Sequence, residues 1–273
     1  MDELEVSPKN MPDDQKSLRE FVTDIAFRKQ RAAETRFGRG PATVEAPREV
    51  YEESCRRIAE VLESDGYRYS KSSQHLTRSS GDFKFRVSFQ SSRNNVADEF
   101  VALWIHGNVL SPTLKKWRRE HQALRSDFDF VVGGQIGNLR KDTGWLEWNL
   151  ADPNLRDQQL DSAIGQIREI IFPYFSLFED IPTACRALID DDFPASWVID
   201  IVDFLQCFGS PGQARDGASS FLARHADLEG AYGRALDRFT AGGIPDRMLS
   251  VNAEALAAAS IIYNFGDLRM KKD

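Results

Sequence analysis

Several features that would assign a function directly are missing from this sequence. Three cysteines among 273 residues, Cys55, Cys185 and Cys207, are odd in number and widely spaced. That pattern is typical of buried thiols in a reducing compartment and excludes a disulfide framework. The longest apolar runs, such as residues 170–175, fall far short of the roughly 18–20 residues that cross a bilayer. The chain starts with acidic and polar residues, where a secretory signal needs basic and then apolar ones. We therefore expect a cytoplasmic protein that does not enter a membrane.

Motifs for metals and cofactors are also missing. The four histidines lie far apart, and none pairs with another at a spacing of four residues; they are His75, His106, His121 and His225. No cysteine is followed by another within five positions, so neither a zinc finger nor a zinc hydrolase helix is present. The glycine-rich segments lack the Gly-Lys-Ser/Thr of a phosphate loop and the full GxGxxG fingerprint. The sequence predicts no metal and no cofactor.

Charge is shared unevenly along the chain. The net charge is −7, but residues 1–150 carry a balance of +1 and residues 151–273 a balance of −8. An acidic second half would repel a phosphate backbone, so a nucleic acid would have to meet the first half. A basic protein partner is easier to accommodate on the second half.

Hydrophobic periodicity predicts a mixed first half. Residues 1–47 are expected to form a mobile tail with one basic helix. The second helix should start at Pro47, because Val50, Tyr51, Cys55 and Ile58 recur at helical spacing. Strands are predicted at 67–79, 82–90, 99–109, 128–132 and 145–150, with a helix that begins after Ser111 between the third and the fourth. The strand at 82–90 alternates apolar and polar residues, whereas the strand at 99–109 is apolar on both faces and should lie centrally, covered on both sides.

From Asp157 onward the pattern is helical. A long amphipathic helix should end or kink at Pro173, and shorter helices follow between prolines and glycines. The predicted fold class is α+β: a helix-flanked antiparallel sheet of about five strands in a domain at residues 48–178, followed by an all-helical section at 179–273.

One family shares part of this pattern. A helix that ends in VLESDGYRYS, the strand pair through FKFRVSFQSS, the apolar EFVALWIHGNV, Trp145 and a helix that closes in IIFPYF together resemble the bacterial family known as domain of unknown function 4304. The resemblance covers residues 48–178 and rests on hydrophobic spacing and turns. It implies the fold and transfers no catalytic residue. The family's bacterial setting implies a protein-binding or immunity-like role.

Two groups of residues carry alternative functions. Asp65, Asp82 and Lys84 follow the order of a metal-dependent nuclease core, in which two acids hold Mg²⁺ and a lysine orients the attacking water. The same triplet arises by chance, and Lys84 also fits a solvated strand face.

A second group combines basic residues with an indole, which could bind phosphate and stack on a base. It consists of Lys115, Lys116, Trp117, Arg118 and Arg119. The alternative is that Trp117 packs on the sheet with the charges around it in water.

An acidic group in the second half suggests a protein partner. Asp190, Asp191 and Asp192 precede a helix that also carries Asp200 and Asp203. Together they could form a patch that attracts a basic ligand. Our leading interpretation is therefore a non-enzymatic intracellular protein-interaction module, of immunity or antitoxin type, that acts through this acidic helical surface.

Overall fold

The fold was determined from a computed structural model of the whole chain. It describes residues 45–121, 123–125, 127–140, 144–190, 197–245 and 251–269. The predicted N-terminal tail and basic helix lie before residue 45, outside the described residues.

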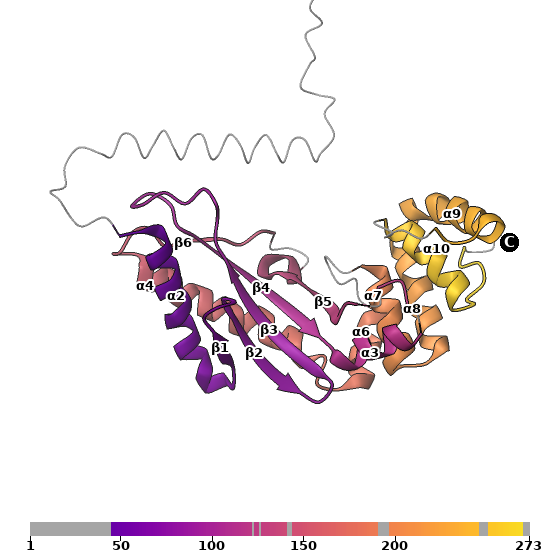
Figure 1. The fold of residues 1–273 in the computed structure, drawn as a ribbon, viewed down its shortest axis with the longest axis horizontal. Helices are drawn as coiled ribbons and strands as arrows, with labels where there is room; N and C mark the ends of the chain where they lie inside the picture. Colours follow the sequence, from indigo (N-terminus) through magenta and orange to yellow (C-terminus); the bar gives the residue numbers. More distant parts are fainter. Residues whose placement is uncertain are drawn as a thin grey trace, which may run out of the picture.

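A single antiparallel sheet organises the first part of the chain (Figure 1). Its strands are paired in the order β1-β2-β3-β4-β5, and the short β6 pairs with the first residues of β4, beside β5. The strands are β1 (Arg68–Ser70), β2 (His75–Ser80), β3 (Phe83–Gln90), β4 (Ala102–Leu110), β5 (Phe130–Gln135) and β6 (Trp148–Asn149). The strand β4 pairs on both sides, which confirms its predicted position inside the sheet. The prediction that both of its faces are covered is wrong, because Trp104, His106 and Asn108 on one face are only half-buried.

Several of the predicted strands have different limits in the structure. The single strand predicted at 67–79 is two strands, because the polar residues 71–74 turn the chain and Gln74 has a positive φ of 50°. The last two predicted strands begin later than expected, at Phe130 and Trp148. Burial and cross-strand pairing decided these limits, and neither can be read from local periodicity.

Helices cover one face of the sheet. The helix α2 (Pro47–Leu62) begins at the predicted proline and packs its apolar side into the core. The helical run after α4 (Arg156–Gln166) does not end at Pro173. It passes through a π-helical turn at Ile167–Ile171, where the Phe172 amide donates to the Ile167 carbonyl, and continues as α5 (Phe172–Ser176). This wider turn accommodates a residue that has no amide hydrogen to donate.

The rest of the described chain is helical, which completes the predicted α+β class. Helix α3 starts at the predicted Ser111 cap, whose hydroxyl accepts from the Leu114 amide at 3.0 Å. Helices α6–α10 gather beyond the end of the sheet where α3 lies (Figure 1). The remaining elements are η2 (Glu63–Asp65), α3 (Pro112–Glu120), η3 (Ile136–Leu139), α6 (Ile181–Asp190), α7 (Val198–Phe208), α8 (Pro211–Arg224), η5 (Ala226–Leu228), α9 (Glu229–Gly242) and α10 (Asn252–Ile262).

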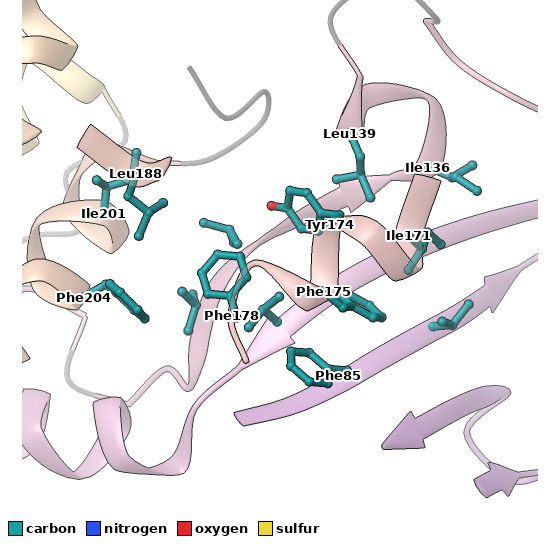
Figure 2. Packing of buried hydrophobic residues seen from close by; sticks show 14 of the residues in the cluster. Phe85, Ile136, Leu139, Ile171, Tyr174, Phe175, Phe178, Leu188, Ile201 and Phe204 are labelled. Carbon is teal, nitrogen blue, oxygen red and sulfur yellow. The ribbon is translucent and has the colours of Figure 1, made fainter. Parts of the chain in front are cut away.

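One hydrophobic core runs from the sheet into the helical section (Figure 2). Phe85 of β3 stacks on Phe175 of α5 with ring centroids 5.0 Å apart. Phe178 then meets Phe204 of α7 edge to face at 5.9 Å, and Phe83 contacts both of these rings. Aromatic packing of this kind contributes beyond the area it buries, so the core continues across the predicted domain boundary at residue 178.

Candidate functional site

The face of the sheet opposite the helices is polar. Directly paired residues in antiparallel strands share a face, and the pairing aligns His75, Ser88 and His106 in one row and Thr77, Arg86 and Asn108 in the next. In Figure 1, strands β2–β4 are drawn in front of the α4–α5 segment, and no described helix crosses in front of them. We call this the open sheet face, and its members on β1–β4 are Arg68, Ser70, His75, Thr77, Ser79, Lys84, Arg86, Ser88, Gln90, Trp104, His106 and Asn108.

The strand residues of the open sheet face carry charge of one sign, whereas the nearby acids Asp82 and Glu147 lie outside the strands. The face carries Arg68, Lys84 and Arg86, of which the first two are exposed and the third is half-buried. None of the six strands contains Asp or Glu. Within the described part of the chain, none of the three cations forms an ion pair. Their positive potential therefore stays available to a partner.

The histidines of this face respond to its charge and burial. Burial, followed by the nearby charges of Arg86 and Lys84, lowers the pKa of His75. Burial alone lowers the pKa of His106. Both rings therefore favour the neutral form, which can donate or accept a hydrogen bond. The buried atoms Nε2 of His106 and Nε of Arg86 have no hydrogen-bond partner among the described residues.

An exposed indole stands beside this face. Trp145 is 53% exposed and meets the rings of Trp104 and His106 edge to face, at centroid distances of 5.6 and 6.3 Å. The Trp104 Nε1 donates to Glu147 at 2.6 Å, which fixes the orientation of the inner indole. Gly137 permits the neighbouring segment to approach, because a Cβ there would lie 1.6 Å from the Gly144 carbonyl oxygen.

The three residues of the nuclease alternative have separate partners. Asp65, after α2, accepts from Arg168 at 2.8 Å, whereas Asp82 accepts from the Thr113 hydroxyl at 2.7 Å. Lys84 is exposed and lines a hollow of about 160 Å³ together with Asp82 and Thr113. Within the described ranges, no three His, Cys, Asp or Glu side chains are grouped to hold a metal ion. The nuclease role stays a prediction.

The five residues predicted to bind nucleic acid on α3 do not share one surface. Trp117 stacks on His121 at 4.5 Å and contacts Tyr263 at 6.2 Å. Arg118 is 0% exposed, so its predicted position on a solvated surface is wrong. Its place four residues after the buried Leu114 puts it on the inner side of the helix. The others lie outside: Lys115 is half-buried, Lys116 pairs with Glu120 at 3.8 Å, and Arg119 pairs with Asp127 at 3.0 Å.

Arg118 instead forms the centre of a buried ion cluster with α7. We define this cluster as Arg118, Arg125, Asp200, Asp203 and Tyr263. The Arg118 guanidinium donates to Asp203 at 2.7 Å and to Asp200 at 2.8 Å, and its third nitrogen donates to the carbonyls of residues 128 and 130. Arg125 also donates to Asp200, and the Tyr263 hydroxyl donates to Asp203 at 2.6 Å.

Burial dominates the electrostatics of this cluster. It raises the pKa of Asp200 to about 7 and also raises the pKa of Asp203, although the charge of Arg118 acts in the opposite direction on both. Burial and the Asp203 carboxylate together raise the pKa of Tyr263, which keeps its hydroxyl a donor. A cluster of this kind fixes geometry more than it adds stability.

The buried ion cluster also removes two residues from the predicted acidic patch. Asp200 and Asp203 are both 0% exposed, so their predicted position on a surface patch is wrong. Asp190 is exposed at the end of α6, and Asp191 and Asp192 lie outside the described residues. Part of the acidic excess of the second half therefore lies inside the protein, where Asp200 and Asp203 pair with Arg118 and Arg125 of the first half.

Together, the fold and the open sheet face define an α+β protein with one helix-covered face, one polar face and an attached helical section. Residues 58–177 match the model of a family described as Domain of unknown function (DUF4304). The match extends from within α2 to the residue after α5, which is the sheet with the helices that cover it. No curated protein and no solved structure matches the chain. Among the described helices, none combines the length and the apolar character needed to cross a membrane.

Sequence reasoning overlooked the open sheet face as a site. The alternation in residues 82–90 had already placed Lys84 and Arg86 on one face. The absence of acids could not be read, because four of the predicted strands still included an acid that the structure places outside the strands. The convergence of the histidines and Trp145 on that face could not be read, because it depends on strand register.

Proposed function

We propose that this protein is a non-enzymatic interaction module of the cytoplasm that holds an anionic macromolecular partner against its open sheet face. The main support is the positive charge of the open sheet face. Its three cations form no ion pair with a carboxylate among the described residues, and none of the described strands contains an acid. Such a surface speeds capture of a complementary partner and fixes its orientation.

The rigid attachment of the helical section supports this role. The shared aromatic core and the buried ion cluster join α7 to β3 and α3, so the sheet is presented by one packed body. Sites on strands of a packed scaffold hold their geometry better than sites on loops. The helices α6–α10 gather beyond one end of the sheet, so they do not cover the open sheet face (Figure 1).

Charge reversal tests the proposal. Retention of the full chain on an immobilised polyanion such as heparin should fall strongly for Lys84→Glu with Arg86→Glu, and increasing salt should release the wild type. The matched control is Lys116→Glu with Arg119→Glu on α3, which should elute like the wild type. If the control loses retention and the sheet variant keeps it, the open sheet face is not the binding surface.

Two other functions remain predictions, an immunity or antitoxin role and a nuclease role. An immunity or antitoxin-type protein would bind a basic protein partner through the acidic surface that starts at Asp190. Asp190→Lys should then weaken capture of that partner from the native host. Unchanged capture would show that the acidic surface does not bind the partner.

A Mg²⁺-dependent nuclease would lose its activity in Lys84→Ala. If the wild type shows no turnover of DNA or RNA with any divalent metal, the nuclease role is excluded.

A further inference from the structure

The open sheet face joins three chemistries on one surface. Cations occupy β1 and β3, neutral hydrogen-bonding groups occupy the centre, and an exposed indole lies beside β4. An anionic macromolecule that binds this face should use all three of these chemistries.

We infer that the partner held by the open sheet face is a single-stranded nucleic acid. This inference rests on the proposed function and identifies the chemical class of its ligand. Lys84 and Arg86 contact the phosphates, the Trp145 indole stacks on a base, and His106 and Asn108 meet base edges between them.

The positions of the cations fit an extended backbone. Lys84 and Arg86 are two residues apart on β3, which places them roughly 6.6–6.8 Å apart along one face of the strand. Arg68 continues the row across β2, because it pairs with Thr77, which in turn pairs with Arg86. A line of cations along and across strands follows a flexible phosphate chain, which is how single strands are commonly gripped.

The aromatic group favours nucleic acid over an acidic protein. Any acidic segment would satisfy the cations, but it gains little from an indole. Trp145 keeps 53% of its surface exposed, and its contacts with Trp104 and His106 are edge to face. Stacking of one base on an exposed aromatic ring is worth about 5- to 150-fold in affinity.

The polar centre adds groups that read base edges. His106 and Asn108 are half-buried, so part of each residue stays accessible on this face. Asn108 lies beside Arg86 in the paired row and offers both a donor and an acceptor. A flat sheet with these groups suits unpaired bases, because bases in a duplex do not expose their faces or pairing edges.

Fluorescence anisotropy of the full chain tests this inference. The probes are labelled 12-nucleotide oligothymidine and oligouridine, the same oligothymidine in a duplex, and a glutamate-rich peptide of equal charge. We expect both single strands to bind more tightly than the duplex or the peptide. Arg86→Gln should weaken binding and lower the slope of log affinity against log salt by about 0.7. Trp145→Ala should weaken binding about 5- to 150-fold with an unchanged slope, and Trp145→Phe should restore part of the loss.

Matched variants separate this site from others on the chain. Arg119→Ala, a cation on α3, and Phe128→Ala, an exposed aromatic 46% accessible, should leave oligonucleotide affinity unchanged. If Arg119→Ala abolishes binding instead, the site lies on α3 and the inference is overturned. Thermal melting confirms that each variant is folded.

The remaining outcomes distinguish the inference from the proposed function. If the peptide binds through Lys84 and Arg86 and the single strands do not, the inference fails while the interaction module stands. If single strands bind equally with and without Trp145, or no better than the duplex, recognition of unpaired bases is refuted. If no probe binds and retention on the polyanion is also unaffected by reversing Lys84 and Arg86, both proposals fail.

Discussion

The Nε of Arg118 donates to the Oδ2 of Asp203 at 2.7 Å, and the two residues are 85 positions apart in the sequence. Both side chains are 0% exposed. Since α3 follows the central strand and α7 belongs to the helical section, this contact holds the two parts of the chain in one arrangement. A buried pair tolerates little displacement, because each charge depends on the other for the interactions it lost with water.

Removal of the central guanidinium should therefore be costly. Arg118→Met leaves Asp200 and Asp203 buried without their main counter-charge, and we expect the free energy of unfolding to fall by about 3–5 kcal/mol. Arg119→Met, one position further on the same helix, removes an exposed pair and should change it by less than about 1 kcal/mol. Urea denaturation measures both, and equal effects would contradict the role of the cluster.

The stability of the protein should depend on pH through Asp200. Burial raises the pKa of this carboxyl from an ordinary value of 3.8 to about 7. Between these values the folded state keeps a proton that the unfolded state releases, so the contribution is fully present below about pH 4 and is lost as pH rises through 7. The free energy of unfolding of the wild type, relative to Asp200→Asn, should therefore fall from pH 4 to pH 8. A relative stability that rises over that range would show that the pKa of Asp200 is lowered.

Two glycines should respond to alanine in opposite directions. Gly137→Ala forces the segment of Gly144 and Trp145 away, and we expect a loss of about 1–3 kcal/mol with a shift in indole fluorescence. Gly165 lies inside α4 with open space around it, so Gly165→Ala should stabilise the protein by about 0.4–1 kcal/mol. The test is thermal and chemical denaturation of both variants, and a destabilising Gly165→Ala would contradict this account.

The sheet and the helical section should unfold together. Phe204 of α7 contacts Phe83 of β3 and Phe178, so Phe204→Ala should cost about 3–5 kcal/mol. Hydrogen exchange should show that amides of β3 and α7 lose protection by the same free energy. Loss confined to α7 would mean that residues 179–273 form an independent domain. Val61→Ala, at a surface position of α2 that is 42% exposed, serves as the control.

Much of the fold could be predicted because it is encoded locally. The alternation of Phe83, Phe85 and Val87 with polar residues identified β3 and its buried face, and the apolar β4 lies in the centre of the sheet as predicted. Pro47 and Ser111 marked the starts of α2 and α3. Each of these features depends on a few neighbouring residues and on the period of a helix or strand.

The sites depended on contacts that local patterns do not contain. The sequence by itself determined that Lys84 and Arg86 share a face, whereas the absence of acids from the described strands followed only from the strand limits in the structure. Only the tertiary structure brought His75, His106 and Trp145 to that face, and only it turned Arg118, Asp200 and Asp203 from predicted surface residues into a buried cluster. The physical reason is that periodicity tells which side of an element is apolar, whereas a charge can be buried wherever a distant segment supplies its counter-charge.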